Sequence, residues 1–108
     1  MNPARTLKSI ETTRRSALAM LNGLVELPMP GEDFGEALRG LGAQGVAAVV
    51  NGRMATVGQI RARLGTIQKY EGLSQVLADS VQYAITAIDL WTLSIEHHEL
   101  ALADAACS

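Results

Sequence analysis

The stretch Leu73–Asp104, LSQVLADSVQYAITAIDLWTLSIEHHELALAD, decides the fold of this 108-residue chain. Residues suited to a core recur along it at alternating intervals of four and three, which is the spacing of one helix face. The members of this stripe are Leu77, Val81, Ala84, Ile88, Trp91, Ile95, His98 and Leu102. The pattern predicts one long helix with a continuous contact face.

This helix is too long and too apolar for a small compact domain. It would be roughly 48 Å long at 1.5 Å per residue, whereas a domain of this size has a radius of gyration of about 13 Å. A second apolar row flanks the stripe, and it consists of Val76, Tyr83, Ala87, Leu90 and Ala101. Because such a helix must be covered over most of its circumference, we expect an elongated bundle, coverage by other subunits, or both.

A first helix is predicted near the N-terminus, antiparallel to the long one. Asn2 is a good N-cap and Pro3 suits the first turn, and the helix must end before Pro28. Its apolar stripe consists of Leu7, Ile10, Ala17, Leu21 and Leu24.

The glycine-rich middle of the chain predicts one or two shorter helices. A second helix would start at Asp33, which forms a capping box with Glu36. Its buried face would consist of Phe34, Leu38, Leu41 and Val49 or Val50. A third helix would open at Thr56 with Gln59 in capping-box spacing, and its apolar face would consist of Ile60, Leu64 and Ile67. Gly72 either ends this helix or lies inside one continuous rod.

A hairpin competes with helix over residues 46–57. Val46–Val50 and Arg53–Val57 flank Asn51-Gly52, which is a two-residue hairpin signal. The alanines in this segment are poor strand residues, and Asn51-Gly52 otherwise makes a left-handed helix stop. The prediction is therefore a single all-α domain over residues 1–108, an elongated bundle of three to four helices, with an α+β fold as the minor alternative.

The charge is small overall and unevenly distributed. The net charge is −2, which gives no general attraction to nucleic acid or to an anionic membrane. Residues 1–69 carry all nine basic groups against five acids, whereas residues 70–108 carry six acids and no Lys or Arg. The two halves can neutralise each other inside one bundle or between neighbouring subunits.

The remaining compositional signals indicate a soluble, cytoplasmic protein. Cys107 is the single cysteine, so no intrachain disulfide forms. No apolar run follows the basic residues at the N-terminus, so we expect no signal peptide, and the apolar stretches are too short to span a bilayer. Arg outnumbers Lys seven to two, a bias associated with GC-rich bacterial or phage genomes.

Candidate chemistry is weak throughout the chain. Glu96-His97-His98-Glu99 contains metal-ligand types, but it lacks the Glu-x-x-His or His-x-x-x-His spacing of a helical metal site. Gly40-x-Gly42-x-x-Gly45 matches a dinucleotide-binding string without the strand that must precede it. We predict no catalytic residue, no metal and no cofactor.

A helix-turn-helix is a further possibility over Thr56–Thr66. With Gly65 as the turn glycine, however, Arg61 occupies the small position of the first helix. Glu71 and Ser74 would then have to be buried in the recognition helix. DNA binding is therefore only a distant alternative.

The functional hypothesis is a non-enzymatic structural or interaction protein that self-associates through its last helix, as a small subunit of a larger bacterial or phage assembly. The candidate interface consists of Leu77, Val81, Ala84, Ile88, Trp91 and Ile95, with Gly58, Gly65 and Gly72 as sites of close helix approach. The alternative is a small helical adaptor, chaperone or inhibitor that uses the same surface on another protein. No motif in the chain identifies a family.

Overall fold

The computed structural model describes residues 2–27 and 34–107, which form four helices. These are α1 (Pro3–Val25), α2 (Gly35–Val50), α3 (Met54–Gln68) and α4 (Gln75–Cys107). The described residues include no strand, so the predicted all-α fold is confirmed. The molecule measures 58 × 22 × 20 Å and its radius of gyration is 15.5 Å, so the predicted elongation is confirmed as well.

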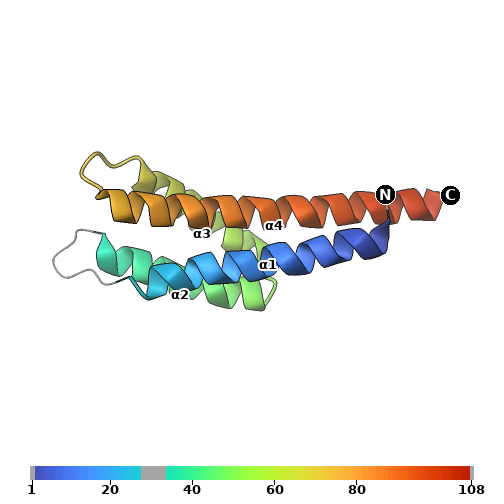
Figure 1. The fold of residues 1–108 in the computed structure, drawn as a ribbon, viewed down its shortest axis with the longest axis horizontal. Helices are drawn as coiled ribbons and strands as arrows, with labels where there is room; N and C mark the ends of the chain where they lie inside the picture. The colour runs from blue at the N-terminus through green and yellow to red at the C-terminus, as the bar shows by residue number, and fades with distance from the viewer. Residues whose placement is uncertain (1, 28–33, 108) are drawn as a thin grey trace.

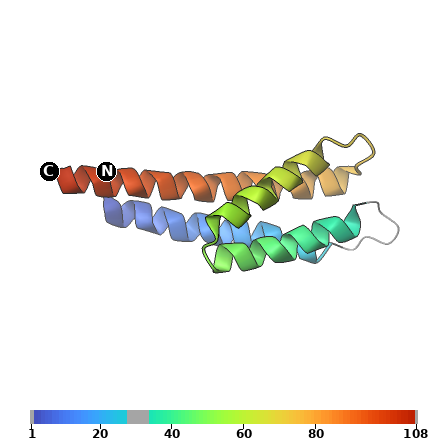
Figure 2. The ribbon, with the colours of Figure 1, turned by 180° about the vertical axis from the view of Figure 1, so that it is seen from behind.

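The helices form two layers of unequal length. α1 and α4 lie antiparallel in one layer, with both termini at the same end (Figure 1). α2 and α3 form a hairpin behind them, as the opposite view shows (Figure 2). Each helix packs on two others, in the cyclic order α1, α2, α3, α4. The hairpin covers only the half of the α1/α4 layer near the loops.

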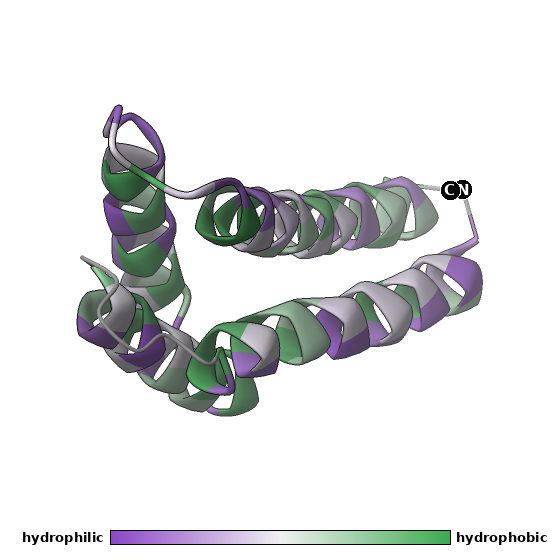
Figure 3. Cartoon of the chain, turned by 60° about the vertical axis from the view of Figure 1, so that its left-hand side comes forward, coloured by the Kyte–Doolittle hydropathy of each residue, from purple (hydrophilic) through white to green (hydrophobic). Residues whose placement is uncertain are grey.

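The uncovered half is a two-helix arm, formed by residues 3–13 of α1 and 92–107 of α4 (Figure 2). The buried residues of α1 begin only at Ala17, and those of α4 end at Trp91 apart from Ala101. The N-terminal half of α1 is accordingly mostly purple to pale in the hydropathy view (Figure 3). The hydrophobic core therefore ends where the α2–α3 hairpin ends.

The ends of α1 and α4 are fixed by local hydrogen bonds. The Asn2 side chain accepts a hydrogen bond of 3.0 Å from the backbone N–H of Ala4, and Pro3 occupies the first helical position. This confirms the predicted cap. At the start of α4, the Ser74 hydroxyl accepts a 3.4 Å hydrogen bond from the backbone N–H of Leu77.

The hairpin alternative for residues 46–57 is wrong, because both flanks of Asn51-Gly52 are helical. Gly52 has a φ of +66°. Its backbone is therefore in the left-handed conformation, which glycine adopts most readily and which commonly ends a helix, here α2. The backbone N–H of Arg53 then donates to the carbonyl of Ala48 over 2.9 Å. This turn joins α2 directly to α3.

Three predicted boundaries need correction or comment. α3 begins at Met54, so Thr56 lies inside its first turn and is not the N-cap. α3 ends at Gln68, which leaves Gly72 in the loop before α4. The predicted cap Asp33 lies outside the described residues, and α2 begins at Gly35 after Phe34, whose φ is 68°.

The core consists of aliphatic side chains from all four helices. Leu38 and Val49 of α2 are buried as predicted, whereas Val50 is 54% exposed. The predicted faces of the first and third helices supply Ala17, Leu21, Leu24, Ile60 and Leu64. No polar or charged residue is buried among the described ones.

Candidate functional site

The stripe predicted as the contact face of α4 packs inside the chain over most of its length. Leu77, Val81, Ala84, Ile88 and Trp91 are at most 3% exposed and belong to the core. Ile95 packs at the edge of the core, and Leu102, in the arm, is 50% exposed. From Leu77 to Trp91, the covering helices therefore come from this chain.

The three glycines predicted to allow close helix approach are open within the chain. A Cβ atom on Gly58 or Gly72 would meet nothing within 4 Å, and one on Gly65 would meet only the Arg61 guanidinium at 3.5 Å. The close approach occurs instead at Gly42 and Gly45 of α2, where an added Cβ atom would lie 2.8 Å from the backbone oxygen of Leu21 and 2.7 Å from its Cδ2, respectively.

The large residues of the second apolar row of α4 remain on the surface, whereas its two alanines, Ala87 and Ala101, are buried. Among the described residues, half of the large hydrophobic side chains that are exposed come from this one helix, and they are Val76, Tyr83, Leu90, Leu93, Leu100 and Leu102. Val76, Tyr83 and Leu90 are spaced by seven and are 67%, 60% and 50% exposed. Exposed apolar residues gathered along one helix mark an interaction surface more often than scattered ones do.

A row of small residues on α1 lies beside this row. A hollow of about 210 Å³ is lined by Ala19, Met20 and Gly23 of α1 and by Ser80 and Tyr83 of α4. We call the surface formed by the two rows the back face, because α2 and α3 pack on the other side of the layer (Figure 1). Its exposed and half-exposed residues are Arg5, Ser9, Thr12, Thr13, Ser16, Ala19, Met20, Gly23, Val76, Ser80, Tyr83, Leu90 and Ser94.

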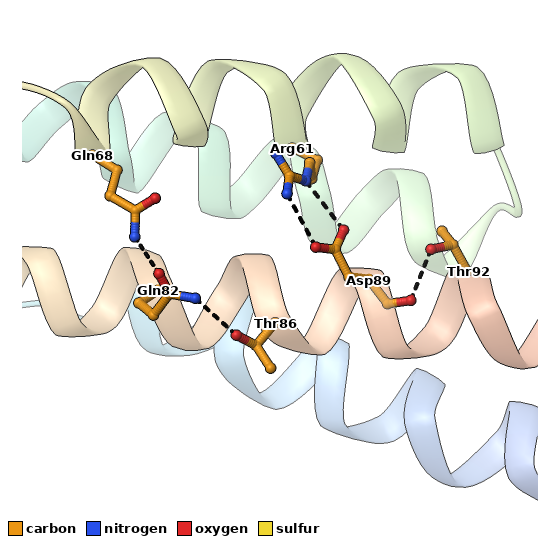
Figure 4. Close-up of polar contacts among 6 residues, drawn as sticks. All are labelled: Arg61, Gln68, Gln82, Thr86, Asp89 and Thr92. Atoms are coloured by element: carbon orange, nitrogen blue, oxygen red, sulfur yellow. Dashed lines mark hydrogen bonds and ion pairs between the residues drawn. The ribbon is translucent and has the colours of Figure 1, made fainter.

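The polar groups between α3 and α4 hold these two helices together (Figure 4). The Arg61 guanidinium donates two hydrogen bonds of 3.1 Å to the Asp89 carboxylate. These hydrogen bonds, and then the negative charge of Asp89, raise the pKa of Arg61. Gln68 donates to Gln82 on the same seam. Arg61 is the basic residue that joins the two oppositely charged halves of the chain.

The histidine segment lies in the arm. Nδ1 of His98 is 2.8 Å from the hydroxyl of Thr6, which ties α4 to α1. Among residues 2–27 and 34–107, no group of three or more His, Cys, Asp or Glu side chains is placed to hold a metal ion. The contact that the structure shows for His98 is thus the hydrogen bond to Thr6 between the arm helices.

A further hollow lies between α2 and α3 near the loop end of the hairpin. It has a volume of about 480 Å³, and Arg63 is the one charged residue in its lining. Phe34 and Tyr70 also line it, with ring centroids 4.7 Å apart and planes at 41°. Among the described residues that line this hollow there is no carboxylate and no histidine, and Arg63 and Tyr70 are the titratable side chains.

α3 is also unbroken at Gly65, so the turn of a helix-turn-helix is missing there. Within the described part of the chain, no helix combines the length and the apolar character needed to cross a membrane. Comparisons with protein-family models, with curated proteins and with solved structures found no match.

Proposed function

We propose that this chain is a non-enzymatic structural protein that self-associates through α4, as one subunit of a larger assembly. The observation that carries the proposal is the exposed row Val76, Tyr83 and Leu90, each at least half exposed and spaced by seven residues. Helix faces with this repeat bury their side chains between those of a facing helix.

The energetic argument is the transfer of apolar surface out of water. Burial stabilises by about 25 cal/mol per Å² of apolar area, and the described residues leave about half of the surface of Tyr83 and of the exposed leucines of α4 uncovered. Leu93 and Leu100 are 46% and 57% exposed on another face of α4, the one that packs on α3 nearer the loops. An assembly that buries these side chains would cover α4 over most of its circumference, as we expect for a helix this apolar.

The non-enzymatic part of the proposal rests on the polar groups of the chain. Catalytic acids and bases usually sit in clefts where burial or a close charge perturbs their pKa. Among the described residues no titratable side chain is buried, and the one shifted pKa belongs to Arg61, whose partner Asp89 lies on the surface. This arrangement is typical of an ion pair that stabilises the fold rather than one that takes part in catalysis.

Molar mass by size-exclusion chromatography with light scattering, across a hundredfold dilution, tests the proposal. We expect a mass of two or more subunits at high concentration. The variant Leu90→Glu should shift the protein toward monomer, whereas the control Val50→Glu should not, because Val50 is equally exposed but lies on α2.

A wild-type protein that stays monomeric throughout would contradict self-association. It would favour the adaptor or inhibitor alternative, in which the same row of α4 binds another protein.

A further inference from the structure

We infer that the hollow between α2 and α3 is a binding site for a small apolar carboxylate of the medium-chain fatty acid class. The ligand's carboxylate would pair with Arg63, and its apolar body would extend toward Phe34 and Tyr70. Every residue that lines the hollow belongs to α2 or α3 or lies within two residues of their ends. The inference is therefore independent of the self-association proposed for α4.

The first observation is the size and composition of the hollow. Its volume is about 480 Å³, and sites for small molecules typically have about 300–1,000 Å³ and a mostly apolar lining with a few polar groups. The polar groups in this lining are the side chains of Gln44, Arg63 and Thr66 and the hydroxyl of Tyr70, and the remaining lining residues are apolar or glycine. This lining suits a ligand with one polar group and an apolar body.

The second observation is that small residues keep the α2 side of the hollow open. Ala37 and Gly40 line it there, and a Cβ atom on Gly40 would meet nothing within 4 Å. Two residues further on, a Cβ atom on Gly42 would lie 2.8 Å from the backbone of Leu21. α2 is thus packed tightly against α1, whereas the space over Gly40 is free for a ligand.

The third observation is that the two ends of the hollow differ in polarity. α2 and α3 run antiparallel from the turn at Gly52 (Figure 2). Gln44 and Arg63 lie nearer this turn, and Phe34 and Tyr70 lie at the far end with ring centroids 4.7 Å apart. The seven residues from Arg63 to Tyr70 span about 10 Å at 1.5 Å per residue. A ligand of this length can place its charge at one end and its apolar body at the other.

Arg63 determines the charge of the ligand. It is exposed, it is the charged residue of the lining, and it forms no ion pair with a described residue. Arg61, in contrast, is bound to Asp89. The chain has no acid between Leu38 and Tyr70, so no carboxylate of this stretch competes for Arg63. A guanidinium group presents a planar fork of donors that matches a carboxylate with two parallel hydrogen bonds.

The backbone of Phe34 adds a supporting observation at the apolar end. Its φ is 68°, which is a rare and strained conformation for a bulky residue. Residues held in such conformations cluster at functional sites, ligand clamps among them. Phe34 lines the hollow and contacts Tyr70, so the strain lies where the apolar body of the ligand would bind.

Isothermal titration calorimetry with octanoate, below its micelle concentration, tests the charged end. We expect one octanoate per chain, and the uncharged analogue octanol should bind about tenfold more weakly or worse, because it lacks the charge-assisted hydrogen bonds. Arg63→Gln should weaken octanoate binding by a similar factor and leave octanol binding unchanged. The matched control is Lys69→Gln, since Lys69 is an exposed cation of the same segment outside the lining. Equal losses in both variants would show a general electrostatic attraction and overturn the inference.

A filling substitution tests the place of binding. Gly40→Leu puts a side chain into the hollow, and the control Gly58→Leu puts one at an equally open glycine of α3 that does not line it. With equal helicity by circular dichroism, Gly40→Leu should abolish octanoate binding and Gly58→Leu should keep the wild-type Kd. Octanoate that still binds Gly40→Leu with the wild-type Kd occupies another surface, such as the exposed row of α4, and the inference is then wrong. A wild-type chain that binds no octanoate at millimolar concentration would also overturn it, whereas the molar-mass test of self-association would be unaffected.

Discussion

A Cβ atom on Gly45 would lie 2.7 Å from Cδ2 of Leu21, so α2 lies against α1 at a separation that only glycine allows. Gly42 is in a similar position, because its Cβ would lie 2.8 Å from the backbone oxygen of Leu21. These two glycines allow α2 of the hairpin to pack closely on α1. Their cost in helix propensity is about 1 kcal/mol each.

Gly42→Ala should therefore destabilise the chain by about 1–3 kcal/mol, because its methyl group would overlap backbone that cannot move aside easily. Gly40→Ala is the matched control on the same helix, where a Cβ meets nothing within 4 Å. That control should stabilise the chain by up to about 1 kcal/mol. Urea denaturation followed by circular dichroism measures both. Equal effects of the two substitutions would contradict the close contact between α1 and α2.

Trp91 should be essential for stability. It is 3% exposed at the point where the core ends, so Trp91→Ala should cost about 3–5 kcal/mol of the free energy of unfolding. Trp91→Phe should cost much less, because the buried indole N–H has no hydrogen-bond partner among the described residues and its removal ends a desolvation penalty. Thermal and urea unfolding of both variants test this. A Phe variant as unstable as the Ala variant would show that the indole N–H is satisfied.

Leu77 and Leu102 lie on one stripe of α4 but in different surroundings, since they are 1% and 50% exposed. Leu77→Ala should cost about 2–5 kcal/mol. Leu102→Ala should lower the free energy of unfolding by well under half of that amount. The two variants are compared by their unfolding midpoints, which are measured at a protein concentration where the chain is monomeric. Equal losses would mean that the arm is covered as completely as the core.

The pair Arg61 and Asp89 should make only a small contribution, because both side chains are about half exposed. A double-mutant cycle with Arg61→Gln and Asp89→Asn should give a coupling free energy of about 0.5 kcal/mol in low salt. Added salt should reduce it. A coupling above about 2 kcal/mol, insensitive to salt, would contradict this assessment.

The sequence predicts most of the fold because apolar spacing and caps are local. The four-three spacing of α4, the Asn2 cap and the helix stop at Gly52 all follow from a few neighbouring residues. The start of α3 does not follow from neighbouring residues in this way. Thr56 and Gln59 have capping-box spacing, but the turn after Gly52 already directs the chain into a helix at Met54. Tertiary packing decides such boundaries.

The candidate site is harder to predict for a physical reason. Spacing shows that the Leu77–Trp91 face of α4 must be covered, but it does not say which helix covers it. Here α1 does so within the chain, and the surface left over is the second row with Tyr83 and Leu90. The small residues of α1 beside it, such as Ala19 and Gly23, give no apolar signal, although their lack of charge was visible in the sequence.

The most direct test of the central claim is the molar mass of the wild-type chain beside Leu90→Glu, by light scattering at matched concentrations. Self-association through α4 predicts at least twice the chain mass of 11.5 kDa for the wild type at high concentration and the chain mass for the variant. A wild-type mass of 11.5 kDa at every concentration would contradict it.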